Sequence, residues 1–393
     1  MSVRFTAIRL GIAQTIAWAS SYYLPAVMAG PISRSRGIAP DEVFLGLSGA
    51  LLLSALLAPL VGRAMEHVDG RRILAASNGV FASGLLVLST AKTSWGMAGA
   101  WGLIGVAMAM GLYDAAFSVL TRLYGAAAKE PITLVALVAG FASTVGWPLT
   151  AWMDQVLGWR LACVTWAALH LCVALPLNAS LHKAATTIVP ERAVITTASP
   201  GALAPSRGLL GLLAYVFAAN WFVSTALAAH LPALFVGTGM TLTAAIAAAA
   251  LVGPAQVAAR VAEMVLLRRA GPLTSAIAAC LLHPIAVALF LFAGAPAAAF
   301  AILHGAGNGI LTIATGTVPL ALFGADGYSR RQGWLALPAR AAQALAPITF
   351  AALLSAAGSQ ALLGTAGLLL AGAIALGLIV HRAHLARSHA ATA

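Results

Sequence analysis

Long apolar runs separated by short polar loops fill the whole chain. Each run is about 20 residues long, which is the length of a helix that crosses a bilayer with every backbone N–H and C=O bonded inside the segment. The pattern therefore predicts twelve transmembrane helices, with boundaries soft by a few residues. They are expected at residues 8–30, 43–65, 73–91, 96–121, 132–153, 161–181, 209–235, 242–267, 273–293, 297–323, 334–355 and 361–381.

Composition agrees with lipid as the solvent of this chain. Hydrophobic residues make up 61% of its 393 residues, charged residues only 8%, and the mean hydropathy is +0.94. A soluble domain of this length cannot bury that much apolar surface. The three cysteines fall inside predicted spans without metal-ligand spacing, so neither a metal site nor a cofactor is expected.

Basic residues mark the sidedness of the predicted helices. With the N-terminus in the cytoplasm, sixteen of the 22 Lys and Arg residues fall in cytoplasmic segments and four in external ones. This bias is the positive-inside signal of a multi-pass protein, and it places both termini in the cytoplasm. The net charge of +12 is scattered through short loops rather than gathered on one face, which argues against nucleic-acid binding.

One hydrophilic segment divides the predicted helices into two sets of six. Residues 182–208 contain three prolines and several Ser and Thr, which is typical of a flexible linker. We therefore expect an N-terminal six-helix bundle at 1–181, a cytoplasmic linker at 182–208, and a C-terminal bundle at 209–393 that ends in a short basic tail. The other loops are too short to hold a soluble catalytic domain.

The loop after the second predicted span carries a recognisable motif. It consists of Gly62, Glu66, Asp69, Arg71 and Arg72. A degraded second copy occupies the corresponding place in the other half: Gly253, Arg260, Glu263, Arg268, Arg269 and Gly271. Together with Gly158-Trp159-Arg160 before the sixth span, this pattern resembles the loop motifs of the major facilitator superfamily, and the resemblance covers the whole chain.

The resemblance implies two pseudo-symmetric six-helix bundles that transport a solute by alternating access. In such a loop a glycine permits close helix approach, while the acid and the arginines form ion pairs that lock one conformation. Arg122, at the end of the fourth span, joins this expected gate. Glu66 stands where the family usually has Asp, and Asp69 where it often has Gly.

The superfamily lines its cavity with the first, fourth, seventh and tenth helices. Each of these spans carries polar or aromatic side chains well inside it, which are the expected substrate contacts. The candidates are Gln14, Trp18, Tyr22, Tyr113, Asn220, Trp221, His304 and Asn308.

Three of the predicted spans carry charged side chains well inside them. A carboxylate within a membrane is a functional hypothesis by default, so Asp114 is expected to bind and release a proton, with a structural ion pair to Arg122 as the alternative. Arg340, with Gln343 one turn away, can hold an anionic group. Arg260 can do the same, or it can pair with Glu263 at a gate or reach towards the interface.

These features predict a secondary active transporter in a bacterial-type inner membrane, monomeric and coupled to protons through Asp114. Tyr113 followed by Arg122-Leu123-Tyr124 resembles monocarboxylate porters and favours a small organic anion or neutral metabolite. Gly140 to Pro148 resembles the fifth-helix motif of drug/proton antiporters, which keeps an efflux pump open as an alternative. A membrane-embedded transferase is less favoured, because no juxtaposed acid/base or metal-binding motif is present.

Overall fold

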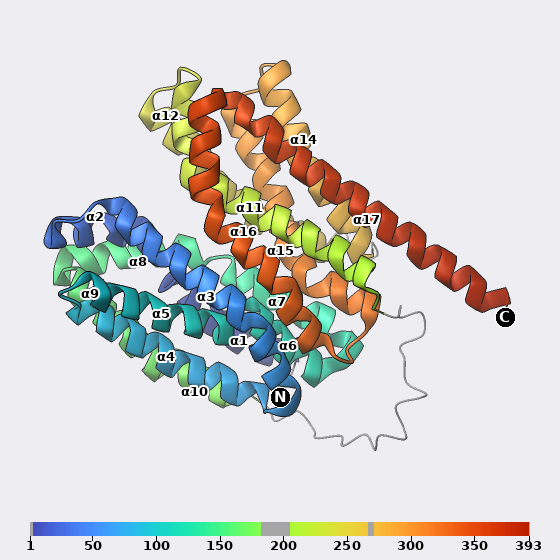
Figure 1. Cartoon of the computed structure of the whole chain (residues 1–393), viewed down its shortest axis with the longest axis horizontal. Helices are drawn as coiled ribbons and strands as arrows, with labels where there is room; N and C mark the ends of the chain where they lie inside the picture. Colours follow the sequence, from blue (N-terminus) through green and yellow to red (C-terminus); the bar gives the residue numbers. More distant parts are fainter. Residues whose placement is uncertain (1–2, 182–204, 266–270, 393) are drawn as a thin grey trace. The chain divides into compact units, whose positions relative to one another are not determined.

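The computed structural model describes residues 3–181, 205–265 and 271–392. Within these ranges the chain is helical throughout and contains no strand (Figure 1). Most of the predicted linker, residues 182–204, lies outside the described residues, as do Arg268 and Arg269 of the second loop motif.

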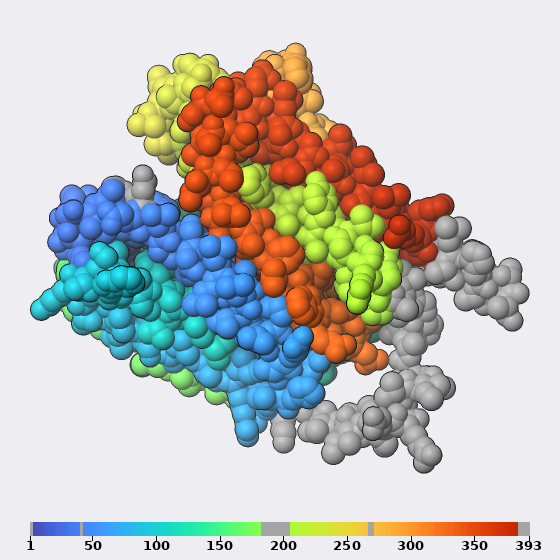
Figure 2. All heavy atoms as spheres, in the orientation of Figure 1, coloured from blue at the N-terminus to red at the C-terminus, as the bar shows by residue number. Residues whose placement is uncertain are grey.

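The chain divides into two compact units. The first contains the described residues up to 181 together with Ala325–Leu337, and the second contains residues 205–324 and those from Pro338 onward. Helix α16 therefore contributes its first part to one unit and the remainder to the other. In the space-filling view, side chains close the gaps between neighbouring helices within each unit (Figure 2).

The predicted spans of the first half each correspond to one helix or to a broken series of helices. These elements are α1 (Val3–Ala19), α2 (Leu24–Arg36), α3 (Pro40–His67), α4 (Gly70–Thr90), α5 (Ser94–Gly111), α6 (Tyr113–Tyr124), η1 (Gly125–Ala128), α7 (Lys129–Ala139), α8 (Ala142–Leu157), α9 (Trp159–Leu169), the π-helical turn η2 (His170–Ala174) and α10 (Leu175–Ala179).

The second half is less interrupted. Its elements are α11 (Arg207–Gly237), α12 (Leu242–Ala250), α13 (Val252–Val265), α14 (Pro272–Phe292), α15 (Ala297–Phe323), α16 (Tyr328–Ala357), η3 (Gly358–Gln360) and α17 (Ala361–Thr392). Helices α8, α11 and α15 continue through Pro148, Pro232 and Pro319, whereas Pro254 lies close to the interruption between α12 and α13.

The described residues contain nine stretches that are long and apolar enough to cross a membrane. Two of them, Ser94–Leu157 with 64 residues and Tyr328–Ala383 with 56, each comprise two predicted spans. At about 1.5 Å per residue and about 30 Å of hydrocarbon, each is long enough for two crossings. The first predicted span falls outside the nine because it is broken between α1 and α2. The all-helical membrane fold is confirmed, and the helices fit twelve crossings.

Burial within each unit separates packed faces from faces suited to lipid. Phe81, Phe117 and Trp166 are buried in the first unit, and Phe235 and Phe300 in the core of the second. Large apolar residues elsewhere on these helices are exposed; Ile302 on α15, for example, is 47% exposed. Such exposure is costly in water but not in hydrocarbon, so these faces suit a bilayer.

Candidate functional site

The first predicted span is interrupted between α1 and α2, where residues 20–23 leave the helix. Oγ of Ser20 lies 2.8 Å from the carbonyl oxygen of Ile16, within reach of a hydrogen bond, and the hydroxyl of Ser21 donates to the carbonyl of Ala17 (2.5 Å). Back-bonding of this kind bends helices. Pro25 has no N–H to donate to the carbonyl of Ser21, four residues earlier, so the regular ladder cannot continue.

The fourth predicted span is interrupted at Leu112, which has an extended backbone (φ −86°, ψ −170°) and begins α6. The N–H of Ala115 donates to Leu112 rather than to Gly111, so the carbonyl of Gly111 loses its helical partner. The Nε2 amide of Gln14, on α1, donates to that carbonyl at 2.6 Å. A side chain from the first span thus repairs the break in the fourth.

Close packing at this break requires a glycine. A Cβ on Gly111 would overlap the side-chain oxygen of Ser77 on α4 and lie 3.1 Å from the ring of Phe81. The interruption in the fourth span therefore lies directly against α4.

The two breaks share one aromatic cluster, formed by Trp18, Tyr22, Tyr23, Tyr113, Phe117 and Trp147. The ring centroid of Trp18 lies 5.0 Å from that of Tyr113 and 5.5 Å from that of Tyr22. Tyr113 stacks on Phe117 at 5.1 Å, and Tyr23 meets Trp147 edge-on at 5.8 Å. Contacts of this geometry add to the stability given by burial alone. The two breaks thus bring together four of the predicted cavity residues: Gln14, Trp18, Tyr22 and Tyr113.

Asp114 lies in the first turn of α6, directly after the break, and is half-buried. The N-terminal end of a helix carries a partial positive charge, which favours a nearby carboxylate. Oδ1 of Asp114 lies 3.4 Å from Nε2 of Gln332, in the part of α16 that belongs to the first unit. Sequence analysis did not single out Gln332, because a polar residue near the predicted start of a span carries no signal of its own.

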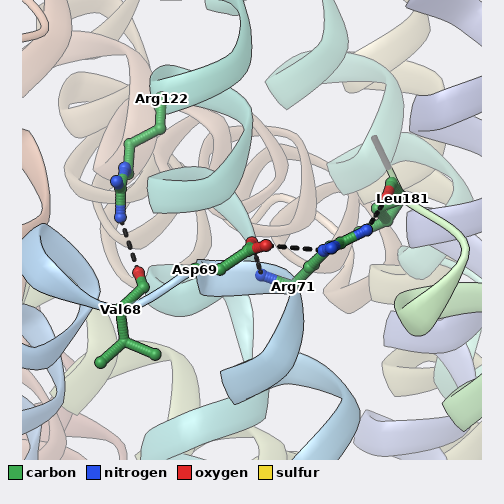
Figure 3. A network of polar contacts seen from close by, with 5 residues as sticks. All are labelled: Val68, Asp69, Arg71, Arg122 and Leu181. Carbon is green, nitrogen blue, oxygen red and sulfur yellow. Dashed lines mark hydrogen bonds and ion pairs between the residues drawn. The ribbon is translucent and has the colours of Figure 1, made fainter. Parts of the chain in front are cut away.

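Arg122, the alternative partner considered for Asp114, bonds elsewhere. Its guanidinium donates to the carbonyl of Val68 at 2.8 Å (Figure 3). It also donates to the carbonyl of Met65, and both acceptors lie at the end of α3. The last carbonyls of a helix have no partner within the helix, and a cation there also complements the helix dipole. Arg122 therefore ties the end of the fourth span to the end of the second.

In the loop between α3 and α4, Asp69 interacts with a neighbouring residue of its own loop. Asp69 caps α4 by accepting from the N–H of Arg71 (3.2 Å), and its Oδ2 pairs with Nε of Arg71 at 2.6 Å. Nη1 of Arg71 also reaches the carbonyl of Leu181 at 3.5 Å (Figure 3). This ion pair stabilises the start of α4, whereas the sequence suggested a lock between helices. Arg72, the neighbouring base, is exposed.

Close approach in the first unit occurs between α3 and the beginning of α16. A Cβ on Gly62 would lie 2.5 Å from the carbonyl oxygen of Ser329, and one on Gly333 would lie 3.0 Å from Cα of Pro59. Arg63 lies over the ring of Trp334, with 5.9 Å between the guanidinium carbon and the ring centroid. The glycine of the loop motif therefore sits at a tight helix contact, as its residue type suggested.

Glu66, the other acid of the loop motif, faces the beginning of α16. Its Oε1 lies 3.7 Å from the position that a Cβ of Gly327 would take, and its charge acts on the guanidinium of Arg331.

In the second unit, polar side chains on α11 and α15 meet. Nδ2 of Asn308 donates to the hydroxyl of Ser224 at 2.9 Å, one turn from Asn220 on the same face of α11. Asn220 is buried, and its Nδ2 has no hydrogen-bond partner in the described chain. Sequence analysis missed Ser224, although its spacing of four from Asn220 was available as a signal. Trp221 is half-buried.

The remaining candidates of the second unit lie on α13, α15 and α16. Nε of Arg260 on α13 donates to the carbonyl of Gly309 at 3.2 Å, and Glu263 is buried one turn away. Arg340 and Gln343 are buried on α16, and Nε2 of Gln343 has no hydrogen-bond partner among the described residues. His304 lies against His283, with ring centroids 4.9 Å apart.

Comparisons with known proteins identify the class. Residues 10–301 match the Major Facilitator Superfamily, so the chain belongs to this family. No curated protein matched it. Membership makes the chain a multi-pass membrane transporter rather than an enzyme.

Three solved structures share the fold. The human organic anion transporter MFSD10 (TETRAN) has a TM-score of 0.71 at 15% identity, over 95% of this chain and 98% of that one. The transporter FucP, in an outward conformation, has a TM-score of 0.72 at 14% identity, over 98% and 99% of the two chains. The proton:xylose symporter XylE, bound to a bromodeoxyglucose, has a TM-score of 0.68 at 12% identity, over 96% and 94%. At these identities the likeness concerns the fold alone.

Proposed function

We propose that the chain is a secondary active transporter of a small solute, working by alternating access in a bacterial-type inner membrane with both termini in the cytoplasm. The meeting of two broken spans in the first unit carries this proposal. Discontinuous helices near the midplane expose backbone polar groups and helix ends to a bound solute. Here Gln14, the aromatic cluster and Asp114 gather at such breaks.

The solute is proposed to be a small organic anion or a neutral metabolite. Nδ2 of Asn220 and Nε2 of Gln343 are buried donors that have no hydrogen-bond partner within residues 3–181, 205–265 and 271–392, and Arg340 lies one turn from Gln343. An unpaired buried donor costs about 1–3 kcal/mol, and a solute rich in oxygen atoms removes that cost when it binds. Amide and guanidinium donors suit a carboxylate.

A drug/proton antiporter is the second candidate. The observation that favours it is the aromatic cluster beside Asp114, because aromatic faces together with a carboxylate attract an organic cation. The two candidates predict opposite charge preferences, so one screen separates them. The purified protein is heated with organic acids, amino acids and cationic antibiotics, and the compound that raises the unfolding temperature identifies the class.

The loop motif is proposed to act as a gate. The tight contact at Gly62 joins α3 to the beginning of α16, and the hydrogen bonds of Arg122 join α6 to the end of α3. Breaking these contacts would open one side of the transporter. Arg260 and Glu263 are proposed to serve the corresponding place in the second unit. A monomer suffices for this mechanism, and it needs neither a metal nor a cofactor.

Proton coupling is proposed to run through Asp114. Movement of one proton down 100 mV supplies about 2.3 kcal/mol, or roughly 50-fold accumulation. We expect Asp114→Asn to abolish uptake or extrusion driven by a pH gradient in proteoliposomes while solute exchange continues. Asp154→Asn is the matched control, because Asp154 lies at the far end of α8. An unchanged response to the pH gradient in Asp114→Asn would remove Asp114 from the coupling mechanism.

A further inference from the structure

The interruption in the first span is held by a buried polar network that the transport proposal does not use. It consists of Ser20 between α1 and α2, His170 in the π-helical turn η2, and Asn78 on α4. All three side chains are at most 2% exposed. The imidazole lies between them, 2.7 Å from Oγ of Ser20 and 2.9 Å from Oδ1 of Asn78. It also stacks on Phe81 with a centroid distance of 4.7 Å.

The direction of each hydrogen bond follows from the donors available. Nδ2 of Asn78 donates to the carbonyl of Leu74 at 2.8 Å, so its oxygen faces the imidazole. An amide oxygen only accepts, hence Nδ1 of His170 carries a hydrogen. Nε2 is then the acceptor of a neutral ring, and the hydroxyl of Ser20 is the donor that reaches it. This hydroxyl can turn instead to the carbonyl of Ile16, which already accepts the N–H of Ser20 at 3.0 Å.

The surroundings favour a neutral imidazole. Helices α1, α4, α9 and α10 pack against η2. Their charged residues are Arg4, Arg9, Arg71, Arg72 and Arg160, and no carboxylate lies on these four helices or on η2. A buried imidazolium without an anionic partner is strongly disfavoured. His170 therefore differs from Asp114: it is a fixed hydrogen-bonding group rather than a carrier of charge.

The geometry points to His170 as a positioning residue that fixes the bend of the first span through Ser20. The bend turns the chain between Trp18 and Tyr22, so its angle decides where these two rings stand against Tyr113. The π-helical turn supports this role, because such turns occur mostly as single insertions, often at functional sites. Any effect of the bend on solute binding rests on the transport function proposed above. The control of the bend by His170 through Ser20 does not depend on that function.

Two substitutions at one position separate the two hydrogen bonds of the imidazole. The amide of Asn can replace Nδ1, so His170→Asn keeps the bond to Asn78 and loses the one to Ser20. The longer Gln reaches the position of Nε2, so His170→Gln keeps the bond to Ser20 and loses the one to Asn78. His283→Asn is the matched control, because His283 is equally buried and bonds Thr365 (2.9 Å) in the other unit.

The test is amide hydrogen exchange of the full-length protein in detergent micelles, followed in peptides that cover residues 17–26. Loss of one buried hydrogen bond is worth about 1 kcal/mol, so His170→Asn is expected to speed exchange there roughly fivefold. His170→Gln and His283→Asn should leave these peptides close to wild type. The ratio between His170→Asn and wild type should be the same at pH 6 and pH 8, since the ring stays neutral.

Other outcomes overturn the inference. Equal exchange in His170→Asn and His170→Gln would show that the bond to Ser20 does not hold the bend. Faster exchange of residues 17–26 in His283→Asn would show a general loss of stability instead. Ser20→Ala removes only the hydroxyl and replaces His170→Asn should that variant fail to fold. No transport assay is needed, so failure here leaves the proposed function standing, and the reverse also holds.

Discussion

At the scale of single residues, two polar side chains of the first unit donate to backbone carbonyls that have no partner within their own helix. In hydrocarbon an unpaired backbone group costs several kcal/mol, so each break needs a side-chain partner. Gln14 supplies one to Gly111, and Arg122 supplies others to the end of α3. The sequence marked Gln14 as a solute contact. Its Nε2 is committed to the backbone, and only its Oε1 has no hydrogen-bond partner in the described chain.

A substitution of Gln14 tests whether its side chain stabilises the break in the fourth span. Gln14→Met keeps the length of the side chain but leaves the carbonyl of Gly111 without its donor. We expect the free energy of unfolding to fall by about 1–3 kcal/mol, seen as a lower midpoint of thermal unfolding in detergent. The control is Gln155→Met on α8, where the side chain is exposed and the midpoint should hardly change. Equal midpoints for the two variants would contradict the repair role.

Two glycines on α3 provide a second test at residue scale. A Cβ on Gly62 meets the backbone of α16, which cannot yield easily, whereas one on Gly49 has nothing within 4 Å. Gly62→Ala is expected to destabilise the first unit by about 1–3 kcal/mol through overpacking. Gly49→Ala should be neutral or slightly stabilising, because alanine favours a helix more than glycine. Thermal unfolding of both variants, side by side, gives the comparison, and equal midpoints would contradict a tight contact at Gly62.

At the scale of elements, hydropathy predicted the position of each span but not its continuity. The window that finds about 20 apolar residues averages over single interruptions, so Leu112 inside an apolar run left no trace. Ser20, Ser21 and Pro25 did carry a signal, since back-bonding hydroxyls before a proline favour a bend. A proline inside a span is a weaker signal, because α8, α11 and α15 continue through Pro148, Pro232 and Pro319.

Contacts between distant elements could not be predicted for a related reason. The π-helical turn and the hydrogen bonds of His170 to α4 and to the bend depend on how three helices pack. Nothing in the sequence around His170 encodes its partners, because they lie 92 and 150 residues away along the chain. The sequence therefore identifies the polar residues inside the spans, whereas the contacts between them depend on packing.

The end of α3 offers a test of how elements are joined. Arg122→Ala removes the guanidinium that donates to the carbonyls of Val68 and Met65. These two carbonyls, at the end of α3, then lose that donor. We expect a loss of about 1–3 kcal/mol in the free energy of unfolding, since hydrogen bonds from a charged group are stronger than neutral ones. Arg72→Ala, which removes an exposed base from the neighbouring helix, should cost less than about 0.5 kcal/mol. Denaturation of both proteins in a series of detergent mixtures gives the comparison.

At the scale of the whole molecule, each unit has a histidine hydrogen bond between its third and sixth spans, but the histidine lies on the opposite span in the two units. In the first unit a histidine of the sixth span bonds an amide of the third, His170 to Asn78. In the second, a histidine of the third span bonds a hydroxyl of the sixth, His283 to Thr365. Each imidazole also contacts a phenylalanine, Phe81 or Phe300. Such clasps between outer helices favour units that move as rigid bodies, which alternating access requires.

The orientation of the molecule in the membrane gives the last prediction. The excess of basic residues in alternate loops predicts that the loop after α3 faces the cytoplasm and the loop after α4 faces outward. His67 and Lys92 are exposed residues in these two places. In a background without Cys163, Cys172 and Cys280, we introduce His67→Cys or Lys92→Cys and treat intact cells with a maleimide that cannot cross membranes. Lys92→Cys should react at once, and His67→Cys only after the cells are permeabilised. The opposite pattern would invert the protein and place the contact of Gly62 with α16 on the outer side, so the proposed gate would close against the exterior.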